Sequence, residues 1–170
     1  HDGRAVAAED IKFSWERALA LAASGESLTA GTYLSDIVGV AEVIAGKAKE
    51  ISGLAVVDTR TLQVTIDAPK AYFLSKLAHP VAFVVDRRNV EASQGSGQPW
   101  WAEPNGTCPF RLRTWEPGMV MVLDANEDYY GTPPSVPHVV FRLYGGVPRL
   151  MYETGEIDVA QVFAEELNEV

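Results

Sequence analysis

The chain has 170 residues, of which 47% are hydrophobic and 22% charged, and its formal net charge is -9. This length supports one medium domain or two small ones with a real hydrophobic core. The acidic balance argues against nucleic acid as a partner, because affinity for phosphate backbones depends on clustered Lys and Arg. No apolar run approaches the roughly 20 residues of a membrane-spanning helix, and the single cysteine excludes an intrachain disulfide.

The two ends of the chain indicate a processed protein or a piece of a longer one. The sequence opens with His1 rather than Met and shows no signal-peptide pattern. It stops in the segment AEELNEV, which predicts the start of a helix with no cap after it.

Two helices are predicted in the first third of the chain. Over residues 9–22, apolar residues such as Trp15 and Leu19 fall at helical spacing behind an acidic first turn, where the helix dipole favours negative charge. A shorter apolar periodicity over residues 36–44 predicts a second helix, and Gly46 is placed to end it.

The middle of the chain predicts a hairpin and then a helix and a strand. Residues 53–67 give two strand-like runs joined at 58–60, with alternating apolar and polar positions in the second run. After them, residues 70–79 suit a short helix and residues 81–85 a buried strand. The composition of residues 87–106 is typical of turns, so a domain boundary is expected there.

The last third predicts more strands than helices. The segments PFRLRTW and MVMVLDA are expected to form a second hairpin around Glu116, Pro117 and Gly118. A turn over 126–135 and a strand over 138–144 follow, and residues 147–163 predict a helix, a turn with Gly and a short strand. Strands interleaved with helices predict a mixed α/β fold class.

Cys108 is the one candidate nucleophile. A thiolate nucleophile needs a base beside it, and no signature in the sequence brings His79 or His138 to this residue. The preferred interpretation is a small apolar filler next to Pro109, with a cysteine-dependent hydrolase kept as an alternative.

A calcium loop is the second candidate, because Asp124, Asn126 and Asp128 occupy alternate positions, as EF-hand ligands do. Tyr129 stands where the loop needs Gly, and Ser135 where it needs Glu, so a polar turn that closes a hairpin is preferred. The three histidines are scattered without ligand spacing, and no metal site is predicted.

Two further features lie in the turn-rich segment. Trp100 and Trp101 offer large contact area, and both a role in ligand binding and hydrophobic anchoring of the loop fit them. Asn105 and Gly106 open a glycosylation sequon, but Asn-Gly is also a common turn pair, and the turn is preferred.

Four stretches in order resemble one known family. HDGRAVAAEDIKFSWERAL resembles the F-x-D-G-x-P-x-T-A-E-D-V-x-F-S-x-E-R opening of the family 5 extracellular solute-binding proteins, the oligopeptide- and dipeptide-binding components of bacterial ABC importers. GLAVVDTRTLQVTIDAPKAYFLSKLAHP resembles the hairpin and following helix of that family. PNGTCPFRLRTWEPGMVMVLDANEDYYGTPP resembles its G-T-G-P-F and L-x-x-N-x-x-Y-Y signature, and YETGEIDVA its G-E-I-D segment.

Two residues depart from the family pattern. Cys108 stands in place of the middle glycine of G-T-G-P-F, where a residue with a Cβ would be strained if the backbone needs a positive φ. Ala8 stands in place of a Thr that would cap the first helix, which would cost the helix about 1 kcal/mol.

The resemblance implies a fragment of a periplasmic-binding-protein type II fold. Residues 1–105 would form the smaller inserted α+β domain, and residues 106–170 part of the first ligand-binding lobe. The opposite lobe, with the aspartate that pairs with the amino terminus of a bound peptide, would lie outside this sequence.

The function implied is capture without catalysis: two lobes close around a peptide and deliver it to an ABC permease in the membrane. Neither a catalytic residue nor a cofactor or metal is implied. The protein would lie in the periplasm or on the extracellular face of the membrane, with a lipid anchor in a preceding region as an open alternative. The cleft-facing candidates, chosen at element ends in the matching stretches, are Tyr33, His79, Phe83, Trp101 and Thr107.

Other ligands stay open within the same family, because its members also bind oligosaccharides or metal chelates. The resemblance also predicts that the isolated chain self-associates, since the segment after Asn105 would lack partner strands and expose sheet edges and apolar faces.

Overall fold

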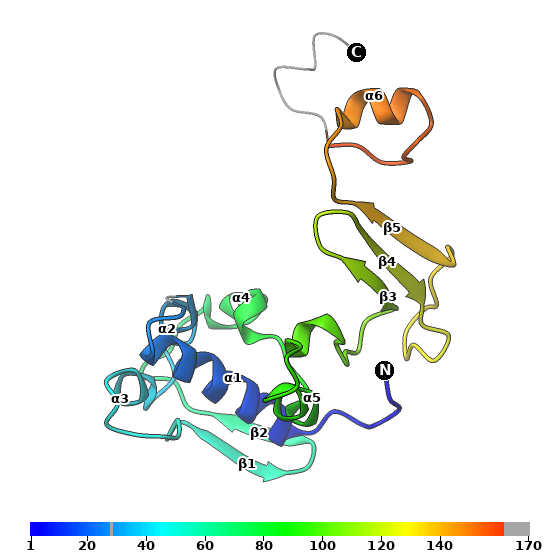
Figure 1. Cartoon of the computed structure of the whole chain (residues 1–170). Helices are drawn as coiled ribbons and strands as arrows, with labels where there is room; N and C mark the ends of the chain where they lie inside the picture. Colours follow the sequence, from blue (N-terminus) through cyan, green and yellow to red (C-terminus); the bar gives the residue numbers. More distant parts are fainter. Residues whose placement is uncertain (28, 162–170) are drawn as a thin grey trace. The chain divides into compact units, whose positions relative to one another are not determined.

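The computed structural model describes residues 1–27 and 29–161, and these residues form two compact units (Figure 1). Unit 1 comprises His1–Cys108 with Asp128–Gly131, and unit 2 comprises Pro109–Glu127 and the chain from Thr132 onward. Each unit combines helix and strand, which confirms the mixed α/β class. The assignment of residues 1–105 and 106–170 to an inserted domain and a lobe stays a prediction, and the segment AEELNEV lies outside the described residues.

Unit 1 contains the predicted first helix and the predicted hairpin, whereas the second predicted helix is shorter than expected and a short helix, α2, lies in the predicted loop before it. Its helices and strands are α1 (Ala8–Ala23), α2 (Thr29–Tyr33), α3 (Val40–Ile44), β1 (Leu54–Asp58), β2 (Thr61–Val64), α4 (Phe73–Lys76), η1 (Pro80–Ala82), α5 (Arg87–Ser93) and η2 (Trp100–Ala102).

The beginning of α1 differs from the expected cap. The N-cap residue is Ala7, and Ala8 lies inside the first turn with 3% of its surface exposed. The Asp10 carboxylate accepts a hydrogen bond of 2.8 Å from the Ala7 N–H, which is the return half of a capping box. The prediction that Ala8 occupies the cap position is therefore wrong.

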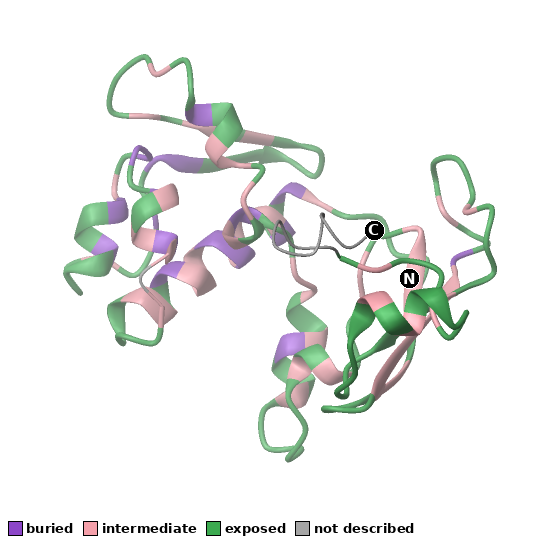
Figure 2. Cartoon of the chain, turned by 90° about the horizontal axis from the view of Figure 1, so that it is seen from above, coloured by how far each residue is buried: buried purple, intermediate pink, exposed green. Residues whose placement is uncertain are grey.

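The core of unit 1 forms around the apolar face of α1. Trp15 and Leu19 from this face are buried, and the Trp15 indole N–H donates to the carbonyl oxygen of Ala82 at 2.9 Å. Figure 2 shows buried positions, in purple, along the long helix α1. The buried members of this cluster are Trp15, Leu19, Ala30, Leu34, Ile37, Val40, Val43, Ile51, Leu54, Phe73 and Ala82.

The hairpin β1–β2 is antiparallel, with Leu54 opposite Val64. Its alternation is as predicted, because Leu62 and Val64 are partly buried while Gln63 between them is exposed. At Gly53 the backbone approaches so closely that a Cβ would lie 2.7 Å from the carbonyl oxygens of both Thr65 and Val38, so this position requires glycine.

Two predictions for the second half of unit 1 are wrong. The run at 81–85 is no strand, because Pro80 starts the 3-10 helix η1 and the Val85 N–H donates to the Ser14 hydroxyl at 2.9 Å instead of to a neighbouring strand. The turn-rich segment also contains the helix α5, whose first turn is capped by the Asp86 side chain through the Arg88 N–H.

Unit 2 is built on the predicted second hairpin and a third strand. The antiparallel sheet has the order β3–β4–β5, with β4 in the centre. The strand predicted after Gly155 is absent over the described residues 157–161, and residues 162 and 163 lie outside them. The elements of this unit are β3 (Phe110–Glu116), β4 (Val120–Ala125), β5 (His138–Arg142) and α6 (Pro148–Glu153).

Burial differs sharply between the two units. Among the described residues, every buried hydrophobic residue belongs to unit 1, and the one buried residue of unit 2 is Asn126. In unit 2, side chains such as Val140, Phe141 and Leu150 are about half exposed, at 55%, 48% and 47%. Among the described residues, no helix is long and apolar enough to cross a membrane.

We predict that Leu19→Ala lowers the free energy of unfolding by about 2–5 kcal/mol, because it removes a fully buried side chain and leaves a cavity. Leu74→Ala is the matched control, since this leucine is 76% exposed and its truncation should cost less than about 0.5 kcal/mol. Urea unfolding followed by circular dichroism measures both. Equal losses in the two variants would contradict the position of Leu19 in the core.

Candidate ligand-binding site

Two of the five predicted site residues are in direct contact. The Tyr33 ring, at the end of α2, stacks on the His79 imidazole with 3.8 Å between ring centroids and 21° between the planes. His79 is the N-cap of η1, and its Nδ1 accepts a hydrogen bond of 3.2 Å from the Val81 N–H, which fixes the ring. Phe83 follows η1 directly and is 59% exposed. Tyr33, His79 and Phe83 are called the aromatic group below.

An ion-pair cluster around Asp36 joins two segments of the chain near Tyr33 and His79 in sequence. The buried Asp36 carboxylate accepts hydrogen bonds of 2.7 Å from both Lys70 and Lys76. These bonds connect Lys70, which precedes α4, and Lys76, within α4, to the loop that follows α2. The bonds from Lys70 and Lys76 hold the pKa of Asp36 below its ordinary value.

The two tryptophans have different surroundings. Trp100 lies under the Arg17 guanidinium, 5.1 Å from the ring centroid, and Arg87 lies 4.5 Å over the Phe13 ring. These two arginine–aromatic contacts fasten η2 and α5 to one side of α1. Trp100 therefore anchors its loop, whereas Trp101 is 45% exposed and stays a candidate for ligand contact.

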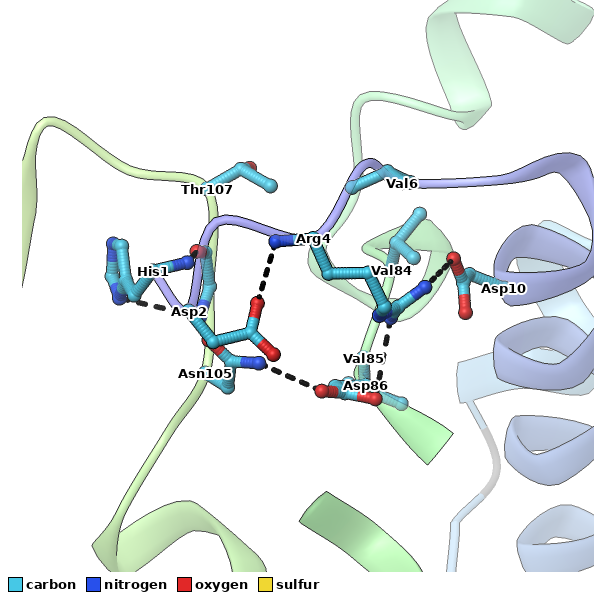
Figure 3. Close-up of a pocket in the computed structure, with 11 residues that line it drawn as sticks. His1, Asp2, Arg4, Val6, Asp10, Val84, Val85, Asp86, Asn105 and Thr107 are labelled. Carbon is cyan, nitrogen blue, oxygen red and sulfur yellow. Dashed lines mark hydrogen bonds and ion pairs between the residues drawn. The ribbon is translucent and has the colours of Figure 1, made fainter. Parts of the chain in front are cut away.

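Thr107 lies on the wall of a small pocket of unit 1 (Figure 3). The cavity measures about 40 Å³. This volume accommodates a few water molecules and is far below the roughly 300 Å³ of a small-molecule pocket. The pocket cannot hold a peptide. Its walls are formed by His1, Asp2, Arg4, Val6, Asp10, Val84, Val85, Asp86, Asn105, Gly106 and Thr107.

Asp86 is the centre of the polar contacts in this pocket. One of its oxygens accepts from the Asn105 amide at 2.7 Å, and the other accepts from the Arg4 guanidinium at 3.3 Å (Figure 3). Arg4 also donates to Asp10 at 2.8 Å. Asp86 thus binds the beginning of the chain and the segment around Asn105 at the same carboxylate.

The backbones of these two segments are also joined. The His1 backbone nitrogen donates to the Gly106 carbonyl oxygen at 2.7 Å. The His1 ring accepts from the Gly106 N–H through Nδ1 at 3.3 Å and contacts the Cys108 carbonyl oxygen through Nε2 at 3.1 Å. This pattern fits a neutral imidazole protonated at Nε2.

Both carboxylates that hold Arg4 titrate below the ordinary range. Burial raises the pKa of Asp86, but the hydrogen bonds from Asn105 and the Arg88 N–H and the charges of Arg4 and Arg88 outweigh burial and leave the pKa below 3.8. Burial likewise opposes the bonds from Arg4 and Ala7 at Asp10, and the pKa of Asp10 is also lowered.

Sequence reasoning missed this polar junction. Asp86 is the N-cap of α5, and Asp is a common residue at that position. The turn-forming composition of the residues after it favoured a loop, so the helix and its cap were not predicted. The prediction of a turn at Asn105 and Gly106 is wrong, because these residues run without a turn and the Asn105 amide is bound to Asp86.

The two histidines considered as bases for Cys108 have other contacts, and the predicted absence of a calcium loop can be compared with the described residues. His79 stacks on Tyr33, and His138 contacts Asp124 at 2.8 Å. Asn126 accepts from Arg111 at 2.8 Å, and no group of three potential metal ligands is found among the described residues. The backbone at Cys108 has no positive φ, so the strain considered for this replacement of glycine does not arise.

Comparisons with known proteins define the class of protein. The model of the bacterial extracellular solute-binding proteins, family 5, middle region, matches residues 1–170. The chain is 31% identical to the periplasmic oligopeptide-binding protein OppA of Escherichia coli K12 over 93% of its length, and 32% identical to the probable deoxycholate-binding periplasmic protein YgiS of the same organism over 98%. The structure of Listeria monocytogenes OppA bound to peptide aligns with 89% of the chain, with a TM-score of 0.73 and 25% identity.

The chain therefore belongs to the family 5 bacterial extracellular solute-binding proteins, and its fold is that of a part of these periplasmic-binding-protein-like structures. It spans about 30% of the length of the relatives it matches.

We predict that Asp86→Asn weakens the acid dependence of stability. A folded-state pKa below the ordinary value contributes stability above about pH 4 that is lost as the pH falls through the folded pKa. The variant should be less stable at pH 7 by about 1 kcal/mol, since Arg4 is partly exposed, and should lose less stability below pH 4.

The measurement is urea unfolding of the wild type and the variant between pH 7 and pH 3. Glu91→Gln is the control, because this exposed carboxylate of α5 has no ion pair among the described residues. Parallel pH profiles for the wild type and Asp86→Asn would contradict the role assigned to Asp86.

Proposed function

We propose that the chain is part of the substrate-binding component of an ABC-type importer, which captures oligo- or dipeptides and delivers them to a membrane permease. The observation that carries this proposal is the family match over the whole chain, together with the similarity to OppA. The peptide bound to the Listeria relative supports the ligand class.

The proposed mechanism is enclosure without catalysis. Parts of the protein outside residues 1–170 close over a peptide, and this chain contributes apolar contacts from the aromatic group and from Trp101. Exposed aromatic side chains suit such a role, because they offer large contact area with few rotatable bonds. Thr107, an exposed residue on the wall of the small pocket, stays a candidate for contact with the ligand.

The same comparison supports a proposed location. We place the protein in the periplasm or at the extracellular face of the membrane, as OppA and YgiS are periplasmic proteins. A lipid anchor would require a preceding segment. The half-exposed apolar side chains of unit 2 support self-association of the isolated chain, which light scattering would detect as an oligomer.

We predict that peptides raise the melting temperature of the full-length protein. A ligand at about 100 times its dissociation constant stabilises the folded state by about 2.7 kcal/mol, which thermal unfolding resolves. Oligosaccharides, nickel chelates and deoxycholate are tested in parallel. A shift with one of these and none with peptides would retain the family and overturn the peptide assignment.

We also predict that Phe83→Ala weakens peptide affinity about tenfold, because an exposed aromatic contact is lost without a change in the core. Val57→Ala is the control, since this residue of β1 is exposed to a similar degree, 60% against 59%. Isothermal titration calorimetry measures both. Unchanged affinity in Phe83→Ala would remove this residue from the proposed site.

A further inference from the structure

A second hollow lies in unit 1, formed by α5, the loop after it and η2. Its volume is about 290 Å³, close to the roughly 300 Å³ at which small-molecule pockets begin. It is several times larger than the pocket at Asp86. We call this cavity the α5 hollow. It is lined by Asn89, Ala92, Ser93, Ser96, Gln98, Pro99, Trp100 and Glu103.

The walls of the α5 hollow are fixed before any ligand arrives. The Asn89 amide donates to the Glu103 carbonyl oxygen at 2.6 Å. This bond connects α5 to the residue that follows η2. The Ser96 hydroxyl donates to the Ser93 carbonyl oxygen at 2.9 Å and accepts from the Gln98 N–H at 3.2 Å. The Arg17 guanidinium lies over the Trp100 ring, 5.1 Å from its centroid.

Several polar groups of this wall have no partner within the described chain. The Gln98 carboxamide, the Glu103 carboxylate and the Trp100 indole N–H make no hydrogen bond or ion pair there. The Asn89 side-chain oxygen is buried and has no hydrogen-bond partner either. The Gln98, Glu103 and Trp100 groups therefore offer donors and acceptors that have no partner within the described chain.

The chemistry of the lining selects a neutral, hydroxylated ligand. No Lys or Arg lines the hollow, so an anion would find no countercharge. The Arg17 guanidinium already occupies one side of the Trp100 ring, which disfavours a ligand cation on the other side. Hydroxyl groups can donate to Glu103 and accept from Gln98, while an indole ring provides a flat apolar surface.

We propose that the α5 hollow binds a single pyranose ring of a sugar, with Trp100 as the stacking surface and Gln98 and Glu103 as the hydroxyl partners. The volume limits the ligand to about one ring. This site is separate from the aromatic group and does not rest on the peptide assignment.

The test is a titration of the full-length protein, labelled with ¹⁵N in its tryptophans, with glucose, galactose and N-acetylglucosamine. The Trp100 indole N–H signal, assigned through Trp100→Phe, should shift saturably with at least one sugar. Gln98→Ala and Glu103→Gln should each weaken that binding about fivefold, as expected for the loss of one hydrogen bond.

Matched controls are Gln94→Ala and Glu91→Gln, which change the same residue types on α5 and its C-cap outside the hollow. They should leave the sugar titration unchanged. The proposal is overturned if no sugar gives a saturable shift, if the controls weaken binding equally, or if cyclohexylammonium shifts the signal as strongly as the sugars do. Peptide-induced stabilisation is measured on the same variants and should be retained, so failure here is distinguishable from failure of the importer proposal.

Discussion

Burial of one face of α1 is the constraint on which unit 1 depends. Trp15 and Leu19 close the core, and the Trp15 indole holds the Ala82 carbonyl, which positions η1 and with it the His79 ring that stacks on Tyr33. The opposite side of the same helix uses polar and aromatic contacts, since Arg17 supports Trp100. One helix thus positions both candidate binding regions, and a shift of α1 would move both.

The two units differ in how much of their stability they can supply themselves. Unit 1 has a closed apolar core, whereas the described part of unit 2 has a three-stranded sheet whose apolar side chains are only partly covered. An antiparallel sheet needs a second layer on its apolar face. The chain belongs to a family whose relatives are about three times longer. This supports the interpretation that parts of the protein outside residues 1–170 supply the second layer.

The sequence predicted the elements whose pattern is local and failed where a single long-range contact decides. Alternation was sufficient for the hairpin at residues 53–67, and spacing for α1. The run at 81–85 has the composition of a strand, but Pro80 and the Ser14 hydroxyl direct it into a 3-10 turn and a loop. Asp86 became important only because Arg4 and Asn105, distant in sequence, reach it.

By itself the sequence determined the mixed α/β class, the order of most elements and the family, because periodicity, turn residues and ordered motifs are properties of neighbouring positions. Only the tertiary structure decided that Tyr33 meets His79, that Trp100 is an anchor and Trp101 is not buried, and that the segments around His1 and Gly106 run together. These pairings join segments that lie far apart in the chain, and packing of that kind leaves no periodic mark in the sequence.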